Sequence, residues 1–156
     1  EWKIDAPELS ESDDPMQEMP NCWLYTSYMK RVVATESYAQ GLSVLLPCFW
    51  VYMHVGHVML KLREKLDAED PDSKSNRKPQ YDAWIDMYAG DEFEKEVTDF
   101  IAMVNAECDR IQSSDENDPQ AALARMQQHF VMGCKLEHMF WDQASTCMQW
   151  PEIGGL

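Results

Sequence analysis

The segment from Ser37 to Leu66 constrains the fold most, because it is the longest and most apolar stretch of the chain. Its apolar residues continue at helical spacing, so we expect a central helix that is buried on most sides and capped by Ser37. Pro47 lies inside this segment and is expected to kink the helix directly before Cys48, because proline donates no backbone hydrogen bond and clashes with the preceding turn. No uninterrupted apolar run reaches the roughly 18 residues expected of a membrane span.

Other segments also show helical periodicity, and none alternates as a strand does. The pattern predicts helices over 21–36, 81–88, 91–111 and 118–148. Asn21 is expected to cap the helix over 21–36, and Gly90 to close the helix over 81–88. Asp118 as cap and Pro119 as first helical residue open the helix over 118–148. A polar loop is expected over 67–80, and an extended lead-in over 1–19. The sequence therefore predicts a single all-α domain, a helical bundle, over residues 1–156.

Charge and cysteine content exclude several classes of function. The net charge is −15, from 28 acidic and 13 basic residues with no basic stripe, which argues against nucleic acid or a membrane as partner. The five cysteines are odd in number and include no CxxC pair, which argues against a disulfide framework and favours a reducing compartment, the cytoplasm. The chain begins at Glu1 without a leader pattern, so we expect a fragment, a processed product or a trimmed chain.

Cys48 is the first candidate for chemistry. It follows the expected kink, where a local helix start would favour a thiolate. A free cysteine on an apolar helix is nevertheless more often a small hydrophobic residue, and on the residues alone packing is favoured for Cys48. Packing is also the interpretation of the other four cysteines, which are Cys22, Cys108, Cys134 and Cys147.

Glu137 is the second candidate, because its neighbours at helical spacing make a mainly apolar stripe that contains Cys134, Phe140 and Trp141. Buried carboxylates are rare unless they are paired or functional, so Glu137 is a candidate proton donor or acceptor. The alternatives are an outward-facing glutamate, or a structural one bonded to a tyrosine or tryptophan.

The remaining polar aromatic and histidine residues are weaker candidates. The tyrosines Tyr25, Tyr52, Tyr81 and Tyr88 could each reach a ligand, although tyrosines on helices more often pack in the core. His54 and His57 are three residues apart on one expected helix and could meet a metal, but the ExxH pairs of a di-iron bundle are absent.

Three segments together resemble one protein family. LLPCFWVY, YDAWIDMYAGDEF and HFVMGCKLEHMFWDQA occur in the order and approximate spacing of the C-terminal two thirds of TenA family proteins, the thiaminase II or aminopyrimidine aminohydrolase group. YTSYM, at Tyr25, resembles the tyrosine-bearing helix that precedes the PCxW run of that family. The resemblance covers about Pro20 to Trp150. The cysteine in PCFW resembles the one found in the cysteine-containing branch of the family.

This resemblance implies a heme-oxygenase-like bundle without a metal or organic cofactor, usually assembled as a homotetramer. The implied activity is hydrolysis in thiamin salvage, which converts 4-amino-5-aminomethyl-2-methylpyrimidine or thiamin to 4-amino-5-hydroxymethyl-2-methylpyrimidine. Cys48 matches the family nucleophile, and Glu137 matches the carboxylate that exchanges a proton with the ring. The implied substrate-binding residues are Tyr25 and Tyr88, with Tyr52 as a pocket wall and Phe140 as a weaker one.

One departure from the family concerns the rest of the pocket. The aspartate that grips the pyrimidine belongs, in the family, to helices upstream of the segment that corresponds to Glu1. The chain therefore resembles the C-terminal part of a TenA-like domain whose N-terminal helices lie elsewhere, and it is expected to expose a large apolar surface. Two alternatives stay open: a non-catalytic TenA-like helical binding or interaction module, and a metal or heme bundle that uses His54, His57 and Glu137.

Overall fold

The structure is a computed structural model that describes residues 18–70, 72–114 and 118–151. This part of the chain contains helices and no strand, as the all-α prediction requires. The helices are α1 (Pro20–Thr35), α2 (Tyr38–Glu69), α3 (Ser73–Asn76), α4 (Pro79–Tyr88), α5 (Asp91–Gln112) and α6 (Pro119–Thr146). The expected lead-in over 1–19 lies outside the described residues except at its end.

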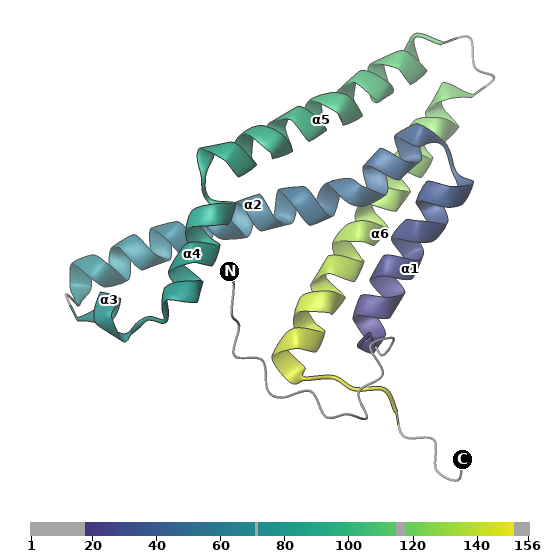
Figure 1. The fold of residues 1–156 in the computed structure, drawn as a ribbon. Helices are drawn as coiled ribbons and strands as arrows, with labels where there is room; N and C mark the ends of the chain where they lie inside the picture. The colour runs from purple at the N-terminus through teal and green to yellow at the C-terminus, as the bar shows by residue number, and fades with distance from the viewer. Residues whose placement is uncertain (1–17, 71, 115–117, 152–156) are drawn as a thin grey trace.

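Helix α2 is the centre of the fold, and every other described helix packs against it (Figure 1). Helices α1 and α6 lie side by side against one half of α2, α3 and α4 lie against the other half, and α5 runs along it. The helix continues through Pro47. Gly133 of α6 makes the close approach possible there, because an added Cβ would lie 2.8 Å from Pro47 Cγ and 3.1 Å from the carbonyl oxygen of Val44. The two helices therefore meet directly beside Cys48.

The central position of α2 explains only part of its apolar composition. Contrary to the expectation from uninterrupted runs, α2 is long and apolar enough to cross a membrane by length and composition alone, and 33% of its most apolar window is buried. The buried residues of α2 lie between Ala39 and Pro47, with Gly56 in addition. Large apolar residues of its later part, such as Val58 and Leu62, are exposed, so the expectation of a helix buried on most sides holds only for the first part of α2.

Two of the predicted caps are confirmed. Ser37 Oγ accepts a hydrogen bond from the backbone N–H of Gln40 at the start of α2. Asp118 Oδ1 accepts one from the N–H of Ala121 at 2.9 Å, and Pro119 is the first residue of α6. The end of α6 was predicted near Met148, but the helix closes at Cys147, which adopts the left-handed conformation with φ 52°.

The prediction that Asn21 caps the first helix is wrong. The helix begins one residue earlier, with Met19 at the N-cap, and Asn21 is buried between α1 and α6. Its Nδ2 donates to the carbonyl of Met139 at 2.8 Å, and its backbone N–H donates to Gln143 Oε1 at 2.5 Å. Tertiary hydrogen bonds to α6 therefore replace the local cap.

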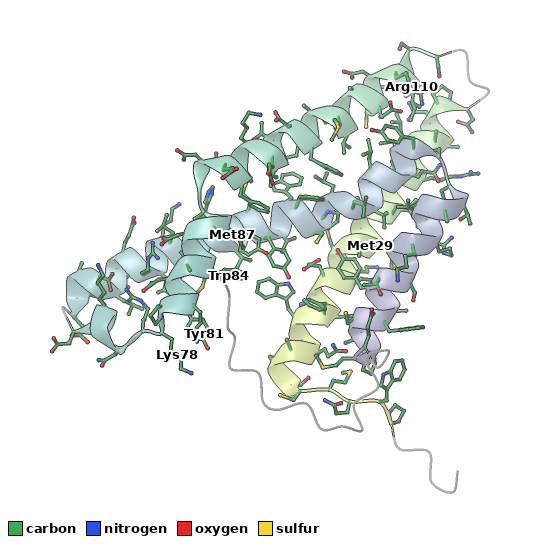
Figure 2. The ribbon with its side chains drawn as sticks, in the orientation of Figure 1. Met29, Lys78, Tyr81, Trp84, Met87 and Arg110 are labelled. Carbon is green, nitrogen blue, oxygen red and sulfur yellow. The ribbon has the colours of Figure 1, made fainter. Side chains whose placement is uncertain are left out.

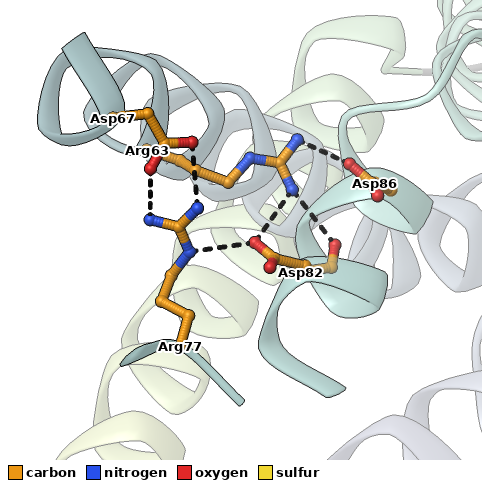
Figure 3. Close-up of polar contacts among 5 residues, drawn as sticks. All are labelled: Arg63, Asp67, Arg77, Asp82 and Asp86. Carbon is orange, nitrogen blue, oxygen red and sulfur yellow. Dashed lines mark hydrogen bonds and ion pairs between the residues drawn. The ribbon is translucent and has the colours of Figure 1, made fainter. Parts of the chain in front are cut away.

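The polar segment over 67–80 is more ordered than a loop, since it contains the end of α2, the one-turn helix α3 and the start of α4 at Pro79. Ion pairs join these parts (Figure 3). Arg77 donates to both carboxylate oxygens of Asp67 at 2.7 and 2.9 Å, and to Asp82 at 3.1 Å. Arg63 of α2 pairs with Asp82 and, at 2.6 Å, with Asp86. These contacts hold α4 against α2.

Candidate active site

The two leading candidates come together where α2 meets α6. Cys48 is half-buried, and the Glu137 carboxyl group is 2% exposed. Burial raises the pKa of the Cys48 thiol, and the nearby Glu137 carboxylate raises it further. Cys134, one turn before Glu137, has its pKa raised by burial and by the same carboxylate. The predicted thiol and carboxylate therefore lie close enough for their charges to interact.

The two oxygens of Glu137 have different surroundings. Oε1 accepts a hydrogen bond from the indole Nε1 of Trp141 at 2.9 Å, across one turn of α6. Oε2 is buried and has no hydrogen-bond partner among the described residues. The alternative of a glutamate bonded to a tryptophan thus describes Oε1, and the Tyr25 hydroxyl lies close to the same carboxylate without a hydrogen bond of good geometry.

Tyr25 of α1 supplies a second buried polar atom. Its side chain is 5% exposed, and its hydroxyl has no hydrogen-bond partner of good geometry in the described part of the chain. Burial raises the pKa of Tyr25 above its ordinary value, followed by the close approach of its hydroxyl to the Glu137 carboxylate, which acts as a hydrogen-bond acceptor and as a charge, and, less strongly, by Cys48 and Cys134. The phenol therefore stays protonated and can donate or accept a hydrogen bond.

Aromatic side chains from α2, α4 and α6 form a group of rings near Cys48 and Glu137, and Figure 2 labels one of them, Trp84 of α4. Tyr52 lies at its centre, with ring centroids 5.0 Å from Tyr88, 5.5 Å from Trp141 and 6.3 Å from Trp84. Burial raises the pKa of Tyr52, followed by the charges of Glu137, Cys48 and Tyr88. Burial and Cys48 raise the pKa of Tyr88. We call Tyr52, Trp84, Tyr88 and Trp141 the aromatic wall.

Gly56 sets how closely α4 brings Tyr88 to this wall. A Cβ at Gly56 would lie 2.6 Å from the carbonyl carbon of Tyr88 and 2.7 Å from its carbonyl oxygen, so no larger residue fits without moving α4. Phe93, at the start of α5, packs edge-on against the Tyr88 ring at 5.0 Å. Tyr88 is thereby held from both sides.

The other two aromatic candidates, Tyr81 and Phe140, make no ring contact with the aromatic wall among the described residues. Tyr81 is 60% exposed, and it makes none of the ring contacts of the wall. Phe140 is half-buried and makes no ring contact with the wall among the described residues. Trp84 and Trp141, which the sequence reasoning did not propose as site residues, are part of it. Their signal was their one-turn spacing from Tyr88 and Glu137, which places both members of each pair on one helix face.

The metal alternative finds no cluster to support it. Within the described ranges, no three His, Cys, Asp or Glu side chains are grouped so that they could hold a metal ion. His54 is exposed, and His57 instead lies 3.6 Å from Glu94 of α5. Glu137 therefore does not share a ligand set with the two histidines.

The fold and site thus define an all-α domain that gathers a thiol, a buried carboxylate and phenols from separate helices around the centre of its longest helix. The chain belongs to the TENA/THI-4/PQQC family, whose model matches residues 1–148. The match begins at residue 1, before the expected start at Pro20, and ends just before Trp150, so the expectation that the chain resembles only the C-terminal two thirds of the family is not supported.

Curated relatives carry related names. The chain is 32% identical over 146 residues to the aminopyrimidine aminohydrolase of Bacillus subtilis (strain 168), an alignment that covers 93% of the chain and 54% of that protein. It is 33% identical over 127 residues to the aminopyrimidine aminohydrolase of Halalkalibacterium halodurans, covering 81% and 49%. It is also 29% identical over 130 residues to the thiamine biosynthesis multifunctional protein ThiED of Corynebacterium glutamicum, covering 83% and 14%. The chain spans about half the length of the first two relatives.

Proposed function

We propose that the protein is a hydrolase of thiamin salvage that releases 4-amino-5-hydroxymethyl-2-methylpyrimidine from the corresponding aminomethylpyrimidine or from thiamin. The observation that carries the proposal is that the buried Tyr25 hydroxyl and the buried Glu137 carboxylate lie close to each other and to the Cys48 thiol, while neither Tyr25 Oη nor Glu137 Oε2 makes a hydrogen bond of good geometry among the described residues. Leaving buried polar groups unsatisfied costs free energy, and such groups in native proteins often serve a ligand. The names of two relatives, both aminopyrimidine aminohydrolases, support the same reaction.

In the proposed reaction Cys48 is the nucleophile and Glu137 transfers protons. Because the pKa of Cys48 is raised, its thiol is protonated at rest and needs a base when the substrate binds. Glu137 Oε2 accepts that proton as Sγ forms a bond with an electron-poor ring carbon, and the proton passes to a ring nitrogen. The bond between the exocyclic carbon and the amine then breaks, and Glu137 passes a proton from the ring amino group to the amine, which leaves as ammonia. Water adds to the exocyclic carbon and gives one proton back to that amino group, and the bond between Sγ and the ring breaks as the ring nitrogen returns its proton through Glu137 to the thiol.

The aromatic wall suits a flat heteroaromatic substrate. Tyr52 and Tyr88 pack 5.0 Å apart, and the charge of Cys48 contributes to the raised pKa of both; we propose that a pyrimidine stacks on these rings. Tyr25 is proposed to hydrogen-bond the substrate near the thiol. Phe140 is a weaker candidate, because it makes no ring contact with the wall.

The remaining part of the pocket is proposed to come from outside residues 1–156, including an aspartate for the pyrimidine from N-terminal helices of the same or another chain. Two observations support this: the chain spans about half of its relatives, and large apolar side chains are exposed. Those on α1 and the outer half of α2 are Trp23, Leu24, Val33, Val58, Met59, Leu62 and Leu66. We also propose a cytoplasmic homotetramer, since such surface favours association and the five cysteines are free.

The test is release of the hydroxymethylpyrimidine, measured by chromatography, from the aminomethyl and formylaminomethyl compounds and from thiamin. Wild type, Cys48→Ser and Glu137→Gln are compared in the natural full-length protein, with Cys108→Ser of α5 as a matched control at another half-buried cysteine. Turnover lost in the first two variants and kept in the control supports the proposal. Equal turnover in Cys48→Ser and wild type contradicts the cysteine mechanism.

The alternative function is a non-catalytic TenA-like binding or interaction module. A folded wild-type protein that binds the aminopyrimidine and releases no product identifies this module. A protein that neither binds nor converts any of the three compounds rejects pyrimidine salvage as well.

A further inference from the structure

The indole of Trp141 provides the hydrogen bond that distinguishes the two oxygens of Glu137. We infer that Trp141 is a positioning residue that fixes the Glu137 carboxylate so that Oε2, and not Oε1, meets the substrate and the Cys48 proton. This inference rests on the proposed function for the role of Glu137. Trp141 itself is not assigned contact with the reacting atoms.

The hydrogen bond has the geometry that such a role requires. Trp141 Nε1 lies 2.9 Å from Oε1, and the two residues are four apart on α6, so the rigid helix sets the distance between them. A hydrogen bond to an ionised carboxylate is stronger than one between neutral groups. The last torsion of a glutamate is otherwise broad and roughly two-fold, so that an untethered carboxylate turns easily. The indole removes that freedom, while Oε2 makes no hydrogen bond of good geometry among the described residues and the carboxylate stays close to the Tyr25 hydroxyl.

The indole is in turn held by the aromatic wall. The ring of Trp141 packs against Tyr52 at 5.5 Å with an interplanar angle of 59°. Tyr52 lies one turn after Cys48 on α2 and also contacts Tyr88 at 5.0 Å. A chain of contacts therefore runs from the helix that carries the thiol, through Tyr52 and Trp141, to the carboxylate. Helix α2 and helix α6 both contribute to the position of Glu137.

Trp84 offers a matched control. It belongs to the same wall, with ring centroids 6.3 Å from Tyr52 and 4.7 Å from Tyr88, but in the described residues its indole has no hydrogen bond to a carboxylate. Trp84→Phe and Trp141→Phe each remove an indole from the wall and keep a ring. Only the second removes a donor to Glu137.

The first measurement needs no turnover, so it separates this inference from the proposed reaction. The indole ¹H–¹⁵N resonances are recorded in wild type and Glu137→Gln, and those of Trp84 and Trp141 are assigned by absence in the two phenylalanine variants. A charge-assisted hydrogen bond predicts that the Trp141 indole proton moves upfield in Glu137→Gln while that of Trp84 stays. An unchanged Trp141 resonance overturns the inference, whether or not the protein is active.

The second measurement separates positioning from a wall contact. In steady-state kinetics on the aminopyrimidine, Trp141→Phe is expected to lower kcat about tenfold with KM changed less than about twofold, since one hydrogen bond acts on the reacting carboxylate. Trp84→Phe is expected to raise KM instead. Equal kcat and KM changes in the two variants contradict positioning.

A third measurement tests the inference even if the wild-type protein shows no turnover. Alkylation of Cys48 by iodoacetamide, followed by mass spectrometry, responds to Glu137 because its charge raises the Cys48 pKa. In a protein that keeps Glu137, Trp141→Phe is expected to change the alkylation rate of Cys48. In a protein that carries Glu137→Gln, the same substitution should leave the rate unchanged, because Trp141 acts on Cys48 only through Glu137. The same change in both backgrounds refutes the inference. If Trp141→Phe does not fold, the Trp141 indole signal is assigned from its through-space contacts with the Tyr52 ring, and the comparison of wild type with Glu137→Gln still decides the question.

Discussion

Replacing Gly56 with alanine tests whether the contact between α2 and α4 holds Tyr88 at the site. The new Cβ would lie 2.6 and 2.7 Å from the carbonyl carbon and oxygen of Tyr88, whereas ordinary van der Waals contact begins at 3.4 Å. Both atoms belong to the backbone, so no rotamer change relieves the overlap and α4 has to move. Overpacking of this kind costs about 1–3 kcal/mol. Alanine regains about 0.5–1 kcal/mol over glycine in a helix interior, which leaves a net loss of up to about 2.5 kcal/mol.

The free energy of unfolding is measured by urea titration with circular dichroism. Gly41→Ala, in the same helix, is the matched control, because its Cβ would lie 3.8 Å from Val33 Cγ2, in ordinary contact. We expect Gly41→Ala to stabilise the protein by up to about 1 kcal/mol. Gly56→Ala is expected to destabilise it and, because Tyr88 moves, to lower turnover. Equal stabilisation by both substitutions would refute the proposed role of Gly56.

Three further predictions concern other parts of the molecule. Asp82→Asn is expected to lower the melting temperature, because it removes a shared partner of Arg63 and Arg77, and high salt should shrink the difference from wild type. The free energy of unfolding should fall as pH rises through the ordinary thiol and phenol pKa values of 9.0 and 10.0. The reason is that burial raises the pKa of Cys48, Tyr25 and Tyr52 in the folded protein, so that unfolding releases protons at these pH values. In urea titrations at several pH values, Tyr25→Phe should make this fall shallower, and an unchanged slope contradicts the prediction. Cys147→Gly is expected to stabilise the protein by about 1 kcal/mol in the same titration, since glycine adopts the left-handed conformation without strain, and a loss of stability argues against that cap.

The helices were predictable because their causes are local. Apolar periodicity, the Ser37 and Asp118 caps and Pro119 at a first turn act within a few residues of the chain. These signals predicted the all-α class and most helix boundaries. The pairing of Cys48 with Glu137 was inferred from a family resemblance, since 89 positions separate the two residues and no periodicity relates them.

The failures have tertiary causes. Asn21 has the side chain of a cap, but partners on α6 bind it more than a hundred positions away. The segment over 67–80 has the composition of a loop, yet bidentate pairing of Arg77 with Asp67 organises it around a short helix. Trp141 was visible as an apolar neighbour of Glu137, but periodicity carries no information on where an indole N–H points.

By itself, the sequence determined the helical class, the central place of the Ser37–Leu66 segment and the residue types available for chemistry, because local propensity and apolar pattern are properties of short windows. Tertiary structure decided which of those residues meet. Close approach at Gly133 and Gly56 brings α6 and α4 onto α2, and the packing leaves the Tyr25 hydroxyl and the Glu137 carboxylate buried close to each other and to Cys48. The physical reason is that desolvation and charge interactions depend on distances in space, which only the packed helices define.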